Sequence, residues 1–587
     1  MSKIKTKNKF CQSFDGFGGL KVNSPVGSGA MVAFNNFKLL PDGSAEKRKG
    51  FRHIYSVDGE YRGGIAYADG GEEIILCAVG KNLVRISVAD SEASSCEIFS
   101  SEEGAVKFID FLGELYILDG CELYRYLGSC NAEVCTPYIP VYGMGWAHGL
   151  NRIGTVNQPL NMLTPRIKII YSIKDSVVSY FNVGKKIKSV DAVWHAKNQL
   201  PATQYKIGSD GMSIQFNSYY FDGNVEVYLT LDGEEYRNSD FEGCDRTDVF
   251  DAFEDSRIFV YGGEDSGRAY CSVPVDEAEV STQTLHCGRV APVYFPSVSP
   301  VRLNGINKIT AMKRIYDRML IFSEYRTWIT TSLRTEEGRQ RQGIIADTAI
   351  DTIGCPSFGA VSVTDGIYPV TLSHGGVYKW NVDPEFEEEI SVSLISRDVN
   401  TLFDSEFVKN GAVCFNRGEN ELWFANKSSL DGCVMVYNCG SKAWYMYSGI
   451  PIEDFIELGE KVAFRSGNSF YVFDGDEGYD IYEWSEKEIE AVIESAGFDF
   501  SAPAVKKHID RIYLTCDTDG GNILLEVWDT AELLCCILDE SQASKLQSGV
   551  DFFDIHTRTS SSRCVSFRLY AEGRERTRIY GISFFAS

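Results

Sequence analysis

The sequence predicts a mainly β protein: a β-propeller that carries an inserted β-sandwich and a C-terminal β-sandwich. Short alternating apolar runs, separated by Gly, Asn, Asp and Ser, recur along almost the whole chain, as they do in antiparallel sheets. Aromatic residues make up 13% of the 587 residues, and aromatic side chains favour strands. Four of the runs begin near residues 308, 359, 411 and 454, and this spacing of 51, 52 and 43 residues is typical of propeller blades.

Residues 411–447 show the predicted repeating unit most clearly. Four apolar segments are separated by turns and loops, which predicts a four-stranded meander with strands at 412–415, 422–425, 434–437 and 443–446. Similar units begin near residues 63, 106, 308, 359 and 454. No WD, kelch or Asp-box signature repeats, so the propeller prediction rests on the periodic pattern alone.

Two stretches break this period. Residues 130–248 have strands and turns of their own, which predicts a β-sandwich inserted before the ring resumes at 256–261. From about Trp484 the rhythm changes again and predicts a terminal sandwich, in which 488–495 also fits a helical face but is interpreted as a strand. The predicted domains are a basic N-terminal arm and first hairpin (1–52), the first propeller blades (53–129), the inserted β-sandwich (130–248), the remaining blades (249–483) and the C-terminal β-sandwich (484–587).

Charge is distributed unevenly along the chain. The formal net charge is −25, but residues 1–52 carry ten Lys and Arg against three acidic residues, so the arm is +7 and the remainder −32. An acidic protein is not expected to coat nucleic acid. A basic arm on an acidic body can dock onto a neighbouring copy, and an exposed basic tail without a special partner is the alternative.

No apolar run approaches the roughly 18–20 residues that cross a bilayer, and the N-terminus lacks the apolar stretch of a secretory signal.

The sequence does not predict catalysis, and we expect no enzyme, no cofactor and no metal. Seventeen cysteines are odd in number and widely spread, so reduced thiols are expected, and no C-x-x-C pair suggests zinc. Residues 474–478 cluster oxygen ligands but lack the spacing of an EF-hand loop, so a solvated turn is favoured. Nucleotide-binding, metalloprotease and nucleophile-elbow motifs are not found in convincing contexts. Structural or exposed positions are expected for His195, His374 and His508.

The most distinctive segment lies near the N-terminus, where residues 14–25 read FDGFGGLKVNSP and residues 34–51 read FNNFKLLPDGSAEKRKGF. Pro41 fixes φ, Asp42 and Gly43 favour a reversal, and Gly50 follows three cations. This pattern predicts a strand–turn–strand clip. Taken alone, the clip would be the first hairpin of the ring.

This N-terminal segment resembles that of bacteriophage virion proteins of the tail hub and nozzle type. The matching residues, which we take as candidate assembly residues, are Asn36, Leu39, Pro41, Asp42, Gly43, Lys47, Arg48 and Gly50. Residues 360–380 resemble one blade of such proteins, and 495–512 resemble their terminal domain. The large segment 130–248 and the pair Asn35-Asn36 depart from the family pattern.

The resemblance implies a structural ring, a homo-oligomer of six chains, that extends the DNA-ejection channel of a short-tailed phage below the portal and adaptor. It implies as partners the adaptor ring, tail fibre or tail-tip proteins and double-stranded DNA in transit. The protein would be made in the host cytoplasm and reside in the virion tail. An acidic channel wall would repel phosphate and let DNA slide, while an acidic solubilising exterior is the alternative.

Two other classes of function stay open from the sequence. A carbohydrate-binding or glycan-cleaving β-propeller would use exposed Trp side chains and a pair among the 82 acidic residues. A host-encoded adaptor propeller would bind peptides. Activity on surface polysaccharide would favour the first alternative, and recovery of host proteins without phage proteins would favour the second.

Overall fold

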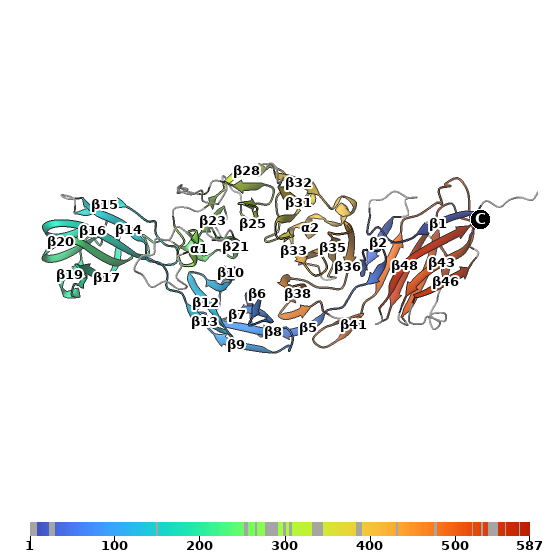
Figure 1. Ribbon diagram of the computed structural model, residues 1–587, viewed down its shortest axis with the longest axis horizontal. Coiled ribbons are helices and arrows are strands. Elements are labelled where there is room, and N and C mark those ends of the chain that lie inside the picture. Colours follow the sequence, from blue (N-terminus) through green and yellow to red (C-terminus); the bar gives the residue numbers. More distant parts are fainter. Residues whose placement is uncertain are drawn as a thin grey trace, which may run out of the picture.

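The computed structural model is mainly β, as predicted, with short helices α1 (Ser239–Glu242) and α2 (Ser405–Lys409). Figure 1 shows three parts in a row, which we call the distal unit, the central body and the terminal body. Among the described residues, no helix is long and apolar enough to cross a membrane. The structure describes residues 9–22, 30–147, 151–236, 238–251, 256–263, 267–275, 291–297, 301–303, 308–331, 344, 346–382, 390–429, 432–474, 478–518, 521–529, 532–537, 550–557, 559–573 and 576–587.

The described strands of the central body form seven sets of four antiparallel strands. The first three sets are β6 (Tyr61–Asp69), β7 (Glu72–Val79), β8 (Asn82–Ser87) and β9 (Ala93–Glu97); β10 (Val106–Phe111), β11 (Glu114–Asp119), β12 (Glu122–Gly128) and β13 (Asn131–Val134); and β21 (Arg246–Phe250), β22 (Arg257–Tyr261), β23 (Arg268–Cys271) and β24 (Val301–Arg302).

The next two sets are β25 (Ala311–Ile315), β26 (Arg318–Phe322), β27 (Thr327–Thr330) and β28 (Ala346–Ile350); and β29 (Val361–Thr364), β30 (Tyr368–Ser373), β31 (Gly376–Val382) and β32 (Ile390–Leu394). The last two are β33 (Gly411–Asn416), β34 (Glu421–Asn426), β35 (Val434–Asn438) and β36 (Ala443–Tyr447); and β37 (Asp454–Leu458), β38 (Lys461–Ser466), β39 (Ser469–Val472) and β5 (Arg52–Ser56). The meander predicted at 411–447 is therefore confirmed.

The seven sets follow one another around a common centre (Figure 1). Their first strands contact one another in the order β6, β10, β21, β25, β29, β33 and β37, and β37 contacts β6. The last set is completed by β5, because Phe470 pairs with Tyr55 and Ser469 with Ser56. Residues 53–56 therefore pair with β39, although they were predicted to belong with the first blades, and the predicted boundary at 248–249 falls inside β21.

The distal unit is one continuous sheet inserted between β13 and β21. Its long strands β16 and β20 pair along most of their length and shift register between Ile173 and Ser176. The two halves of this long hairpin enclose an apolar core, in which the rings of Tyr171 and Phe181 stack with centroids 4.1 Å apart. The strands are β14 (Val141–Ala147), β15 (Arg152–Val156), β16 (Arg166–Asn182), β17 (Ile187–His195), β18 (Asn198–Gln199), β19 (Tyr205–Ile207) and β20 (Ser213–Leu231).

The terminal body combines strands from both ends of the chain. One sheet holds β1 (Phe10–Phe14), β3 (Phe37–Leu39), β4 (Ala45–Lys47), β43 (Ile509–Asp517), β46 (Val550–His556) and β48 (Arg578–Ala586). The other holds β2 (Met31–Asn35), β42 (Ala491–Ser495), β44 (Asn522–Asp529), β45 (Glu532–Ile537) and β47 (Ser566–Glu572), and is continuous with β36. The sheets pack through aromatic rings such as Phe567 and Phe584, whose centroids are 5.5 Å apart.

Two sequence interpretations can be compared with this arrangement. The strand interpretation of 488–495 is confirmed by β42, which is preceded by the short pair β40 (Tyr479–Ile481) and β41 (Glu486–Glu488). The interpretation of the N-terminal clip as the first hairpin of the ring is wrong. The clip is the hairpin β3–β4, and β4 pairs with β48 in the terminal body through Ala45 and Ile579.

Candidate functional site

The eight candidate assembly residues lie on the N-terminal arm, between the terminal and central bodies. Asn36 separates β2 from β3, and Leu39 ends β3. Pro41, Asp42 and Gly43 form the β3–β4 turn. Lys47 ends β4, Arg48 follows it, and Gly50 is buried shortly before β5. The structure brings Asn36 and Arg48 into direct contact, while the turn residues lie at the other end of the hairpin.

Arg48 forms a buried ion pair that joins the arm to β40. Its Nη1 and Nη2 atoms donate to the two carboxylate oxygens of Asp480 at 2.8 and 2.7 Å. Both side chains are only 3% exposed. Two parallel charge-assisted hydrogen bonds fix the orientation as well as the distance of the two groups. Sequence reasoning missed Asp480, which is 432 residues away and carries no local signal of its pairing.

Asn36 also takes part in this connection between the arm and the central body, which we call the joint. It adopts a left-handed backbone conformation with φ of 56°, which asparagine tolerates better than most residues. Its Oδ1 atom accepts from Arg48 Nε and from the Ser448 amide, both at 2.9 Å. Its Nδ2 atom donates to the Glu490 carbonyl at 2.7 Å. One buried amide therefore links the arm, the end of β36 and the segment that leads into β42.

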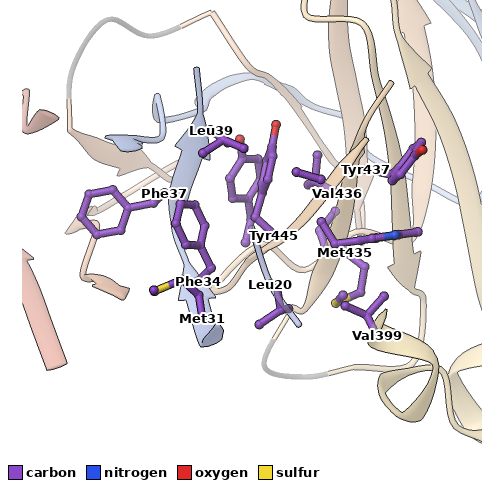
Figure 2. Close-up of a cluster of buried hydrophobic side chains, with 14 of the residues drawn as sticks. Leu20, Met31, Phe34, Phe37, Leu39, Val399, Met435, Val436, Tyr437 and Tyr445 are labelled. Atoms are coloured by element: carbon purple, nitrogen blue, oxygen red, sulfur yellow. The ribbon is translucent and has the colours of Figure 1, made fainter. Parts of the chain in front are cut away.

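Apolar residues of the arm pack beside β36 of the central body. Figure 2 shows Phe34 between Phe37 and Tyr445 of β36, with Leu39 close by. Phe34 is completely buried, and its ring centroid lies 6.1 Å from that of Phe37 and 6.3 Å from that of Tyr445. The joint therefore has two parts: a polar hub, formed by Asn36, Arg48 and Asp480, and an apolar cluster around Phe34. Both kinds of contact resist separation of the terminal and central bodies.

The β3–β4 turn has the predicted strand–turn–strand form. Gly43 has φ of 84°, a conformation that favours glycine, and its carbonyl accepts from the Phe17 amide at 2.7 Å. Asp42 accepts from the Ser44 amide at 3.1 Å and from Arg578 Nη2 at 2.5 Å. Hydrogen bonds from Ser44, together with the nearby Arg578 guanidinium, hold the pKa of Asp42 below its usual value.

Most described cations of the arm have partners within the same chain. Lys38 pairs with Glu419 at 2.5 Å, and Arg52 pairs with Asp474 at 2.9 Å. Lys47 is buried and donates to the Gly573 carbonyl. The acidic partners of Lys38 and Arg52 therefore belong to the same chain. Lys3, Lys5 and Lys7 lie outside the described residues, and a role of the eight candidate residues in contacts between chains stays a prediction.

Three cavities border the joint. One of about 390 Å³ is lined by Asn36, Arg48 and Asp480 together with Lys487 and Glu490. A second of about 340 Å³ lies between the arm and the central body and is lined by charged groups that include Lys461 and Glu421. A third of about 460 Å³ is lined mainly by residues of the arm, among them Lys38, Glu46, Lys47 and Arg48. Among the described residues, no group of three or more His, Cys, Asp or Glu side chains is placed to hold a metal ion.

Glu421 is a buried carboxyl group beside the second cavity. Tyr445 donates its hydroxyl proton to Oε1, and Trp423 Nε1 donates to Oε2 at 3.0 Å. Burial raises the pKa of Glu421 to about 7, although these two hydrogen bonds act in the opposite direction. The protonated form is therefore the one that the folded protein favours in mildly acidic solution.

The raised pKa of Glu421 predicts a pH-dependent stability. The folded state holds this proton more tightly than the unfolded state, so the free energy of unfolding should fall as pH rises from about 4.5 to about 7. The expected loss is roughly 3 kcal/mol across that window, and it persists above it. Glu421→Gln should remove the Glu421 contribution and make the slope shallower, which urea unfolding at a series of pH values would measure. An unchanged slope in the variant would contradict the assignment.

The remaining titratable groups singled out in the sequence have structural contacts. His195 bonds to the Asp222 carbonyl at 2.9 Å, His374 stacks on Tyr325 at 4.9 Å, and His508 bonds to the Thr559 carbonyl at 2.8 Å. In the segment 474–478, for which a solvated turn was favoured over a calcium loop, Asp474 pairs with Arg52, while residues 475–477 lie outside the described residues. The cysteines whose state the structure describes take no part in disulfide bonds.

Comparison with known proteins gives no family. No family model matches the chain, and no curated protein matches it. Among solved structures, BBS1N in complex with ARL6DN has a TM-score of 0.27 at 10% identity, covering 73% of this chain and 98% of that one. An exo-β-1,3-galactanase from Phanerochaete chrysosporium has a TM-score of 0.21 at 9% identity, covering 57% of this chain and 95% of that one. At these TM-scores the likeness carries no argument about function.

Proposed function

We propose that the central body is a seven-bladed β-propeller, that the distal unit is its inserted β-sandwich and that the terminal body is a C-terminal β-sandwich. The closed order of contacts between the first strands of the seven sets supports the propeller. The pairing of β5 with β39 supports it further, because this sheet joins residues near the two ends of the ring. In such a ring, each blade buries its faces against its two neighbours.

On this architecture, the protein functions as a structural component of a short-tailed phage tail. Copies of the chain form a ring that extends the DNA-ejection channel below the portal and adaptor. The observation that supports this function best is the joint itself. Asn36 and Arg48, on which the family resemblance rests, are buried and tie the arm, β40 and the end of β36 together. A conduit component needs such a rigid connection, because its parts must keep their positions while DNA passes.

The test is to locate the chain in intact particles. A short affinity tag placed after Ser587, at the C-terminus that lies on the outer end of the terminal body in Figure 1, can be labelled with gold and imaged by electron microscopy. We expect a ring of labels on the tail, in particles that still infect. Untagged particles are the matched control for background labelling.

Two outcomes would contradict the proposed function. Purified particles that contain no copy of the chain would exclude a virion component. Turnover of a surface polysaccharide by the purified protein, abolished by substitution of a single carboxylate, would instead support the glycan-cleaving alternative.

A further inference from the structure

The distal unit exposes an unusual amount of apolar surface. Sixteen large apolar side chains are recorded as exposed among the described residues, and seven of them belong to this one unit. They are Met144, Val156, Val177, Tyr180, Trp194, Met212 and Tyr220. Exposed apolar side chains gathered in one place mark a contact surface more often than singly scattered ones do.

Strand register places part of this apolar surface in one row. Met144 is opposite Ile170, Ile170 is opposite Glu226, and Glu226 is opposite Trp194. Laterally paired residues in a sheet point to the same face, so this row crosses four strands on one face. The opposite face is the core of the unit, because the neighbouring residues Ile169, Val227 and Val193 are completely buried. The row therefore lies on the outward face.

The exposed cations of the distal unit contrast with the acidic surface of the first two sets. Residues 141–236 contain nine Lys and Arg and eight Asp and Glu, a net charge of +1, and Lys185 and Lys186 pair with Glu235 and Glu234 of the same unit. The exposed cations of the unit include Arg152, Lys174, Lys188, Lys197 and Lys206. Residues 61–134, which form β6 to β13 and the loops between them, contain five Lys and Arg and thirteen Asp and Glu, a net charge of −8. Several of these acids are exposed on and around the outer strands of the first two sets: Glu92, Glu97, Glu102, Glu103 and Glu122.

The acidic surface also offers apolar contact. Leu127 of β12 is 46% exposed, and Val134 of β13 is 61% exposed. Opposite charge steers two surfaces together and fixes their orientation, while apolar contact supplies the favourable free energy of burial. The distal unit and the β6–β13 surface, defined as the exposed side chains of these strands and their loops, are complementary in both respects.

We propose that the outward face of the distal unit docks onto the β6–β13 surface of a second copy of this chain. This inference rests on the proposed ring of copies and identifies the contact that builds it. Two different surfaces meet in such a contact, so it is a head-to-tail interface, and copies joined in this way form a closed ring when the rotation between them closes. The distal unit suits this role because it extends away from the central body, on the side opposite the terminal body (Figure 1).

A charge-reversal experiment tests this contact. One variant combines Lys188→Glu with Lys197→Glu on the distal unit, and a second combines Glu97→Lys with Glu103→Lys on the β6–β13 surface; all four side chains are exposed. Each variant should weaken assembly at least about tenfold in sedimentation velocity, because like charges then face each other. A chain with all four substitutions should regain assembly, since the charges are again complementary.

The apolar row is tested separately. Trp194→Ala should weaken assembly at least about tenfold, as loss of an aromatic side chain that becomes buried in an interface does. The matched control is Trp484→Ala, which removes a tryptophan that is 89% exposed in the turn between β40 and β41. This control should assemble like the wild type. Circular dichroism and thermal unfolding of each variant would verify that it is folded.

The outcomes separate this inference from the proposed function. If wild-type chains form rings and both charge-reversed variants form them equally well, the docking contact is wrong while the ring stands. If folded variants lose assembly but the four-substitution chain does not regain it, charge complementarity between these two surfaces is wrong. If wild-type chains form no ring, either alone or in particles, the proposed function fails together with the docking contact.

Discussion

Replacing Arg48 with methionine is expected to lower the free energy of unfolding by about 3–5 kcal/mol, because the Asp480 carboxylate then stays buried without its partner. The variant also removes the hydrogen bond from Arg48 Nε to Asn36, so the polar hub of the joint loses its centre. Urea unfolding followed by tryptophan fluorescence would measure the loss. Methionine keeps an unbranched side chain of similar length, which limits the change in packing.

The control for this prediction is Arg166→Met in the distal unit. Arg166 pairs with Asp191 at 3.0 Å, but its side chain is 46% exposed, so the same substitution should cost less than about 1 kcal/mol. A third chain with Arg48→Met and Asp480→Leu should recover most of the lost stability, because no charge then stays buried alone. Equal losses from the two single substitutions would show that the buried pair has no special role.

The sequence predicted those parts of the fold that depend on neighbouring residues. The meander at 411–447 alternates apolar strands with turns, so each strand pairs with the next along the chain, and the observed strands follow the predicted segments. The β3–β4 turn was also predictable, since Asp42 and Gly43 specify a reversal from their own chemistry.

Pairings between distant segments were not predictable in the same way. β5 resembles the first strand of a following blade, but it completes the sheet of β37–β39, and β4 pairs with β48. A strand's alternation defines which residues face the core but not which strand lies beside it. The pairings that tie the N-terminal arm to the rest of the chain are of this kind, so the joint could not be derived from the sequence.

The partners of the charged residues in the arm also could not be predicted from the sequence. The arm's excess of cations suggested either docking onto a neighbouring copy or an exposed tail without a special partner. Instead, Lys38, Arg48 and Arg52 each pair with an acidic residue more than 380 positions away in the same chain. Net charge describes a long-range field and says nothing about which groups become buried together. Only the folded structure reveals that part of this charge is neutralised internally.

Replacing Phe34 with alanine is expected to lower the free energy of unfolding by about 3–5 kcal/mol, the usual cost of emptying a large buried aromatic site. Phe34 is completely buried among Phe17, Phe37 and Tyr445, so the cavity would open where the arm meets β36 (Figure 2). Urea unfolding would measure the loss, and limited proteolysis should show faster cleavage near the joint.

The matched control is Phe585→Ala on β48. Its ring is 36% exposed, so solvent can fill the space it leaves, and the expected loss is below about 1.5 kcal/mol. If Phe34→Ala lost no more stability than Phe585→Ala, the apolar cluster would not hold the two bodies together. The joint would then depend on Asn36 and Arg48 alone. A large loss from Phe34→Ala together with a large loss from Arg48→Met would show that both the apolar cluster and the polar hub stabilise the joint.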